Sequence, residues 1–382
     1  MSLLLPLAAS AGGAVLLGAA AELAARAGLR RFGGHYPLRP FLRQRLELSR
    51  EALPMLEPEV RWRVNADGER GEPYRPGAWR LLLAGGSCVE SYYLDQETAV
   101  AGQLEAMLAA PERAARLGPA AVDHGVHVGC VARSRMSCEQ ITEMLAPNLH
   151  RYGRLDCVVL MIGASDMVRW LELSCPTEPW EDRPGARHLW GLHPRGPFGW
   201  SPGSLALRAL AVRLKDRLAP GEVHRTAVGK RMIANRAARR AAPKLDEVPD
   251  PEIMLARFER GLEGLLELLE GVTDRIVVAR QPWFDRELTP EEDRWMWNFG
   301  QGVIYHKPVE VYYTHRVVRE LSRAVAERCG AVARRRGHVD LDTPALFEPG
   351  LDHYYDFYHY TPAGARRVAE LMADAVTGDR PR

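Results

Sequence analysis

Residues Leu81 to Ser91 read Leu-Leu-Leu-Ala-Gly-Gly-Ser-Cys-Val-Glu-Ser. An apolar run this short, ending at two glycines, predicts a buried parallel strand rather than a helix. Gly85 and Gly86 permit a sharp turn that lets the backbone approach a ligand closely. Ser87 therefore falls just past the carboxyl end of a strand, where open α/β sheets bind their ligands. Taken alone, such a serine is more typical of a strand end or a helix cap than of catalysis.

Near the other end of the chain, residues Asp356 to Gly364 read Asp-Phe-Tyr-His-Tyr-Thr-Pro-Ala-Gly. An acid and a histidine three residues apart, just before a Thr-Pro-x-Gly helix start, form a ready base and orienting partner for a distant nucleophile. A neutral imidazole, with an unperturbed pKa of about 6.5, can take a serine proton near neutrality. We therefore expect Ser87 as nucleophile, His359 as base and Asp356 as its partner. His353 is the alternative base; in the competing interpretation Asp356 only caps the last helix and His359 is a surface residue.

Together these two stretches resemble the GDSL or SGNH hydrolase superfamily, which has an early Gly-Asp-Ser or Gly-Gly-Ser nucleophile and a late Asp-x-x-His. The resemblance extends from about Asn65 to Val376 and is interrupted by one long insertion. It implies a three-layer, flavodoxin-like α/β fold with a five-stranded parallel sheet. It also implies a serine ester hydrolase that needs no cofactor and acts on an acylated small molecule, glycan or lipid.

The two middle blocks of this family supply an oxyanion hole, and here the sequence departs from the pattern. The second block usually has Gly in Asn-Ala-x-x-x-Gly-x-x-Ser, but Gly129-Cys-Val-Ala-Arg-Ser-Arg-Met-Ser places Ser134 at that position. The third block, usually Gly-x-Asn-Asp, reads Gly163-Ala-Ser-Asp and places Ser165 where the amide is expected. The first role uses a backbone N–H, which a serine also has. The second uses a side chain, and a hydroxyl reaches less far than an amide.

Losing one oxyanion donor costs on the order of 10²–10³ in rate in other enzymes. The resemblance therefore implies weakened activity unless water, Arg133 or Arg135 supplies the donor. These arginines could instead recognise an anionic substrate, or be solvated surface charges. Two further functions stay open: an O-acyltransferase of the same fold, in which a sugar hydroxyl replaces water, and a catalytically impaired binding module.

The amino-terminal stretch from Ser2 to Ala21 has no charge over twenty residues, about the length needed to cross a bilayer. Three interpretations are open: an uncleaved anchor, a cleaved signal peptide with Ala19 and Ala21 at its cleavage site, and a buried helix. A basic region before the apolar run is missing, which speaks against the signal peptide. The positive-inside rule would place the arginine-rich segment that follows in the cytoplasm, whereas anchored members of the family often work outside. The side of the membrane therefore stays open.

The chain divides into three expected parts: an anchor or signal at 1–28, a linker with a small hairpin at 29–79, and a hydrolase-like domain at 80–376 with an insertion at 173–250. The hairpin rests on the alternation from Val60 to Val64 and the turn residues from Asn65 to Gly68. In the main part, apolar runs and helical periodicity alternate regularly, which predicts a parallel sheet covered on both faces. Besides the strand at Leu81, we expect strands at 126–132, 157–162, 275–279 and 338–341, and helices at 95–109, 139–149, 251–269, 309–335 and 362–375.

The insertion breaks this alternation. Its first half leaves the sheet at the edge where the site is expected, so it could form a lid or a substrate wall. Its second half, from Arg225 to Lys244, is basic and could be an amphipathic helix on an anionic membrane, or a solvated loop. Four tryptophans could stack on a sugar or acyl group or form the core of the insertion: Trp170, Trp180, Trp190 and Trp200.

Composition narrows the possible partners. Of the 382 residues, 46% are hydrophobic and 26% charged, which is ordinary for a globular protein. A net charge of +2 gives no reason to expect a nucleic-acid partner. The six cysteines show no metal-ligand spacing, and His124 and His127 lack acidic or thiol partners, so no metal is expected. Cys88, Cys130 and Cys157 fall in or beside expected strands and are predicted to be buried thiols.

Overall fold

The computed structural model describes residues 4–31, 33–193, 205–304 and 309–378. Its centre is a parallel sheet in the order β10-β8-β5-β3-β4. In chain order this is the arrangement 2-1-3-4-5, so the flavodoxin-like α/β fold is confirmed. The five strands are β3 (Trp79–Gly85), β4 (Val126–Cys130), β5 (Cys157–Ile162), β8 (Ile276–Arg280) and β10 (Val339–Leu341).

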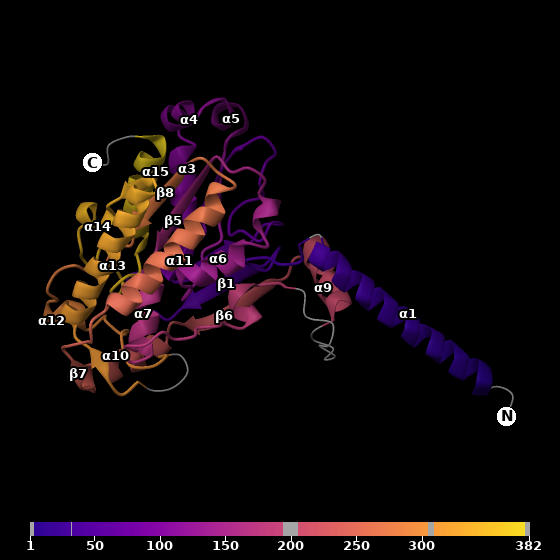
Figure 1. The fold of residues 1–382 in the computed structure, drawn as a ribbon, viewed down its shortest axis with the longest axis horizontal. Helices are drawn as coiled ribbons and strands as arrows, with labels where there is room; N and C mark the ends of the chain where they lie inside the picture. Colours follow the sequence, from indigo (N-terminus) through magenta and orange to yellow (C-terminus); the bar gives the residue numbers. More distant parts are fainter. Residues whose placement is uncertain (1–3, 32, 194–204, 305–308, 379–382) are drawn as a thin grey trace.

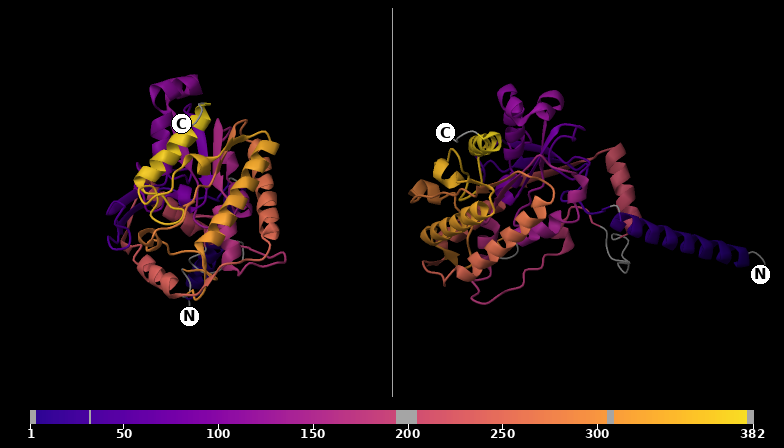
Figure 2. Two further views of the ribbon diagram at one scale, coloured as in Figure 1. Left: turned by 90° about the vertical axis from the view of Figure 1, so that its left-hand side faces the viewer. Right: turned by 45° about the horizontal axis from the view of Figure 1, so that its top comes forward.

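Helices cover both faces of this sheet (Figures 1 and 2). One layer contains α3 (Val100–Leu108) packed on α15 (Pro362–Thr377). In the other, α11 (Glu252–Glu270) packs between α6 (Cys138–Leu145) and α13 (His315–Arg335). The apolar residues of each recur on one side at helical spacing, which buries that side against the sheet. The shorter helices are α2 (Ser87–Glu90), α4 (Pro111–Leu117), α5 (Pro119–His124), α7 (Ala164–Glu172), α8 (Ala186–Leu189), α12 (Pro290–Asp293), α14 (Thr343–Leu346) and the 3₁₀ turn Leu149–Arg151.

Two predicted helix starts were wrong. Asp95 does not cap α3, because its carboxylate accepts the backbone N–H of Arg61 at 2.9 Å and so fastens this loop to a neighbouring strand. The helix begins five residues later, at Val100. Likewise α13 begins at His315 rather than near 309, because the Thr314 side chain caps it. In both places a contact or cap moved the boundary by several residues.

A second, three-stranded sheet lies beside the first and was only partly predicted. The strand expected at 60–64 is β2 (Glu59–Arg63). Its main hairpin partner is β1 (Arg43–Leu48), which precedes it, whereas the turn at Asn65 closes only an isolated antiparallel bridge from Val64 to Arg70. The insertion adds β6 (Glu222–Val228), parallel to β1, and a two-residue pair joins β7 (Lys244–Leu245) to β9 (Tyr312–Tyr313).

The basic half of the insertion forms the helix α10 (Arg231–Ala241), so the loop interpretation was wrong. Two of its arginines face the protein instead of a membrane. Arg236 donates to the carbonyl oxygen of Ala52 at 2.6 Å, and Arg239 donates to the carboxylate of Asp293 at 2.7 Å. Both guanidinium groups therefore hold α10 against the domain.

The tryptophans of the insertion region are packing residues where the structure describes them. Trp170 is fully buried, and its indole N–H donates to the carbonyl of Pro176. Trp180 lies under the guanidinium of Arg257, and Trp190 donates to a backbone carbonyl of α6's last turn. Trp200 lies outside the described residues. These indoles stabilise the insertion and do not line the cavity described below.

The amino-terminal segment is one long helix, α1 (Leu4–Arg31), which extends away from the domain (Figure 1). Most of its described apolar side chains are exposed, Leu17 by 74%. The buried-helix interpretation is therefore wrong. By length and composition, the part from Gly12 to Leu29 qualifies as a membrane span, and a signal sequence would pass the same test. The helix α9 (Ala206–Leu218) packs against its carboxyl-terminal part.

Candidate active site

The turn after β3 is shaped by its two glycines. A Cβ on Gly85 would lie 2.3 Å from the carbonyl oxygen of Met161 on the neighbouring strand, so no larger residue fits. A Cβ on Gly86 would lie 3.0 Å from the hydroxyl of Ser165. The chain therefore turns tightly against β5, and Ser87 opens the short helix α2 at the carboxyl edge of the sheet.

The carboxyl-terminal motif forms a loop that returns to the same edge. Thr361 caps α15 by accepting the backbone N–H of Gly364. Gly364 is required because a Cβ there would lie 2.0 Å from the carbonyl oxygen of His353. The ring of His353 instead donates from Nδ1 to the carbonyl oxygen of Glu348 at 3.0 Å, on the exposed side of the loop. His353 therefore contacts the backbone of its own loop, and it is the ring of His359 that reaches Ser87.

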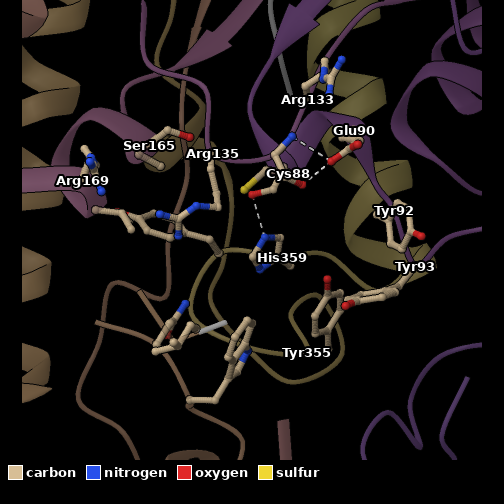
Figure 3. A pocket seen from close by; sticks show the side chains of 18 of the residues that line it. Cys88, Glu90, Tyr92, Tyr93, Arg133, Arg135, Ser165, Arg169, Tyr355 and His359 are labelled. Atoms are coloured by element: carbon tan, nitrogen blue, oxygen red, sulfur yellow. Dashed lines mark hydrogen bonds between the residues drawn. The ribbon is translucent and has the colours of Figure 1, made fainter. Parts of the chain in front are cut away.

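The two motifs meet in one hydrogen-bonded chain, of which Figure 3 shows the part at His359. The Nε2 atom of His359 lies 2.8 Å from the Oγ atom of Ser87. The Nδ1 atom of the same ring lies 2.8 and 2.9 Å from the two carboxylate oxygens of Asp356. Ser87, His359 and Asp356, which come from opposite ends of the chain, are therefore within hydrogen-bond distance of one another in the order expected from the sequence.

The comparisons with known proteins give a fold-level likeness. No family model matches the sequence, and no curated protein matches it. Similar solved structures include LAE5, an α/β hydrolase enzyme from the metagenome of Lake Arreo, with 14% identity, a TM-score of 0.41, and coverage of 79% of this chain and 96% of that one. They also include a catalytic mutant of Axe2, an acetylxylan esterase from Geobacillus stearothermophilus, with 13% identity, a TM-score of 0.42, and coverage of 79% and 95%. A G-D-S-L family protein from Desulfitobacterium hafniense has 8% identity, a TM-score of 0.38, and coverage of 78% and 98%. A likeness at this level leaves the function to be inferred from the chain's own residues.

The electrostatics favour a charged Asp356 beside His359. Burial would raise the pKa of the Asp356 carboxyl, but the charge and hydrogen bonds of His359 outweigh burial and lower it. Burial would lower the pKa of the His359 imidazole, but the Asp356 carboxylate, with a smaller contribution from Glu90, raises it above its usual value. Each group therefore stabilises the charged form of the other.

A tryptophan that sequence reasoning missed completes the support of Asp356. The indole N–H of Trp297 donates to a carboxylate oxygen of Asp356 at 2.6 Å. The backbone N–H groups of Tyr358 and His359 donate to the other oxygen at 2.9 Å each. The carboxylate is 0% exposed and accepts from four donors, so it is held in one orientation. No sequence signal links position 297 to position 356.

The candidate donor at Ser134 already has a partner. Its backbone N–H donates to the carboxylate of Glu90 at 2.9 Å, and its hydroxyl donates to the same carboxylate oxygen. Burial raises the pKa of Glu90, although these bonds oppose the rise. An oxyanion at this position would therefore compete with Glu90 for the N–H. Glu90 was not identified from the sequence, although it stands three residues after Ser87.

The candidate donor at Ser165 is the second residue of α7, which begins directly after Gly163. Gly163 has a φ of +107°, and a Cβ there would meet Val325 at 2.6 Å, so this glycine is required for the turn. The turn brings the Ser165 hydroxyl next to the Gly86 backbone and therefore close to Ser87. The structure places this side chain beside the expected nucleophile; whether it donates to an oxyanion stays a prediction.

A cavity of about 560 Å³ opens onto Ser87 and His359. One side of it is aromatic, with Tyr355 stacked on the His359 ring at a centroid distance of 5.5 Å (Figure 3). The opposite side carries arginines. Arg135 makes two bonds of 2.5 Å to Glu172, while Arg133 donates to backbone carbonyls of residues 37, 187 and 189. Both arginines contact protein groups, so the interpretation of solvated surface charges was wrong. The aromatic residues of the lining are Trp62, Tyr92, Tyr93, Trp297, Phe299, Tyr355 and Tyr358.

Proposed function

We propose that this chain is a serine ester hydrolase that removes an acyl group by a Ser-His-Asp mechanism. The single observation that carries the proposal is the continuous set of contacts from the Ser87 hydroxyl through the His359 ring to the buried Asp356 carboxylate. A serine hydroxyl is a weak nucleophile until a base takes its proton, and this arrangement supplies the base in the required position.

In the proposed mechanism, Ser87 Oγ attacks the ester carbonyl while His359 Nε2 takes its proton. Asp356 stabilises the imidazolium that forms and fixes the ring, so Nε2 stays directed at Ser87. The imidazolium then protonates the leaving alcohol. A water molecule, activated by the neutral ring, releases the acyl group from Ser87. The oxyanion of each tetrahedral intermediate is assigned to the Ser165 hydroxyl and the Ser134 N–H.

The cavity supports an acyl ester of a glycan, a lipid or a small alcohol as the substrate class. Aromatic rings line one side next to the proposed nucleophile, and they offer a large apolar surface on which a sugar ring or an acyl chain can pack. The catalytically impaired binding module is the second candidate. It is favoured by one observation, the donation of the Ser134 N–H to Glu90 instead of to an open site.

We further propose that α1 anchors the protein in a membrane as a single span. Residues 29–79 and the hydrolase-like domain 80–376, with its insertion at 173–250, then stand in water. The exposed apolar side chains of α1 support this arrangement, since exposure to water is costly over such a length. Carbonate extraction of membranes should leave the full-length protein in the pellet. Release into the supernatant would contradict the anchor.

The proposed chemistry is tested by labelling with a fluorophosphonate probe, which reports an activated serine without knowledge of the substrate. We expect the wild type to be labelled and Ser87→Ala to be unlabelled. His359→Ala should also lose labelling, whereas the matched control His353→Ala should keep it, because that ring lies on the outer side of the loop. An unlabelled wild type that is folded would favour the binding module.

A further inference from the structure

A second groove, remote from Ser87, lies between α9 and the three-stranded sheet. Its volume is about 730 Å³, and its lining combines apolar side chains such as Phe41 with four arginines and one carboxylate, Glu72. The arginines come from three elements: Arg43 from β1, Arg63 from β2, and Arg213 and Arg217 from α9. The groove is therefore strongly cationic as well as partly apolar.

Two of these four guanidinium groups have protein partners. Arg63 pairs with Glu72 at 2.6 Å, and Arg213 lies over the ring of Tyr36 at 4.5 Å. Arg43 and Arg217 have no carboxylate or ring partner among the residues that the structure describes. Two unpaired cations facing one groove repel each other, and a bound anion would relieve that repulsion. Guanidinium groups in pairs are well suited to phosphate.

One face of α9 carries four leucines that are exposed to solvent, and two of them, Leu210 and Leu214, also line the groove. Their exposed fractions are 40% for Leu207, 37% for Leu210, 57% for Leu214 and 75% for Leu218. Spacings of three, four and four residues put them on one face of a helix. A stripe of exposed leucine beside cationic side chains is the pattern of a helix that lies in a membrane interface.

The position of α9 relative to α1 also supports a location of α9 in a membrane interface. The Glu22 carboxylate of α1 accepts the backbone N–H groups of Ala206 and Leu207, at 2.7 and 2.9 Å, and so caps the start of α9. Arg39 holds the other end through Asp216 at 2.9 Å. Glu22 is the first charged residue after the uncharged run of α1. If that run occupies the hydrocarbon core, α9 lies at the level of the lipid headgroups (Figure 1).

We propose that α9 and this groove bind the headgroup of an anionic phospholipid in the bilayer that α1 enters. The leucine stripe contacts the acyl region, and Arg43 and Arg217 bind the phosphate. This inference rests on the proposed membrane insertion of α1. It gives the domain a second attachment to the bilayer, which fixes the domain's orientation on the membrane instead of leaving it free to rotate about α1.

The test uses the full chain in vesicles of phosphatidylcholine with a minor fraction of phosphatidylglycerol. The six native cysteines are buried, so a fluorophore can be attached selectively at L218C. V122C is the matched control, since Val122 is also exposed, by 59%, but belongs to α5, which lies at the top of Figure 1 and apart from α9. Doxyl quenchers are placed on phosphatidylglycerol in one sample and on phosphatidylcholine in the other, and the ratio of quenching measures headgroup preference.

We expect quenching at L218C, none at V122C, and a preference for phosphatidylglycerol of about fivefold per arginine at most. R43Q/R217Q should reduce the preference ratio to one while circular dichroism stays unchanged. A ratio of one in the unsubstituted groove, or an unchanged ratio in R43Q/R217Q, would overturn the proposal. So would the loss of preference on adding inorganic phosphate, which would make free phosphate the ligand. Carbonate extraction of the same vesicles separates the two ideas: an extractable chain refutes the anchor, and a resistant but unquenched L218C refutes the α9 site alone.

Discussion

Replacing Trp297 by Phe tests the support of the proposed catalytic carboxylate. The change removes one of four donors from Asp356, which is fully buried, and keeps most of the ring. A hydrogen bond to a charged group contributes about 1.5–3 kcal/mol. At 1.36 kcal/mol per pKa unit, this bounds the effect on the His359 pKa at about one to two units. The less neutralised carboxylate attracts the imidazolium more strongly, so the His359 pKa rises further.

The proposed base acts as a neutral imidazole, so activity is lost below its pKa. The acid limb of kcat/KM against pH should therefore move to higher pH in Trp297→Phe, by up to about two units. Trp62→Phe is the matched control, because Trp62 also lines the cavity and its indole N–H has no partner among the described residues. An acid limb that stays in place in folded Trp297→Phe, or moves equally in Trp62→Phe, would refute this reasoning.

Three further outcomes are expected. Ser87→Ala and His359→Ala should each abolish esterase activity nearly as completely as the double variant, because members of one catalytic unit are not additive; a much weaker double variant would contradict a shared unit. Ser165→Asn should raise turnover of a simple ester by lowering the barrier up to about 3 kcal/mol; no gain, together with a harmless Ser165→Ala, would remove Ser165 from the oxyanion hole. Burial raises the pKa of Asp166 to about 7. Between about pH 4 and 7 the folded state therefore binds a proton that the unfolded state has lost. The free energy of unfolding should fall by up to about 4 kcal/mol as the pH rises through that window. Urea unfolding on both sides of the window should show this loss in the wild type and not in Asp166→Asn.

The main sheet could be predicted because its signals are local. Each core strand is an unbroken apolar run, and every residue of β3 and of β5 is buried, as expected for parallel strands covered on both faces. Gly85 and Gly364 are required by close backbone contacts, and Gly163 by its positive φ and the side chain of Val325, so their motifs could be recognised in the sequence. Strand, turn and helix follow one another within a few residues, so the local sequence pattern is enough to predict most of the sheet and its helices.

Only β2 of the second sheet could be predicted, because β6 has no apolar pattern. All of its residues except Val228 are exposed, and it joins β1 across more than one hundred and seventy positions of sequence. Its partner β1 was hidden in an arginine-rich segment. The contact between Trp297 and Asp356 could not be predicted from the sequence for a similar reason. Such contacts depend on how the loops at the sheet edge pack together, and no local pattern in a single sequence indicates that packing.

The contact between Glu90 and Ser134 is a feature of the site that the motif alone does not reveal. Alignment identifies Ser134 as the residue that replaces a donor glycine, but it does not show which acceptor its N–H meets. The helix α2 carries Ser87 at its first position and Glu90 at its last, and Glu90 accepts both donors of Ser134. Because burial raises the pKa of Glu90, its protonated form is easier to reach than that of an exposed carboxyl, and a protonated carboxyl accepts hydrogen bonds less strongly. In the proposed mechanism, the helix that bears the nucleophile therefore also bears the group that governs whether the Ser134 N–H is available to the oxyanion.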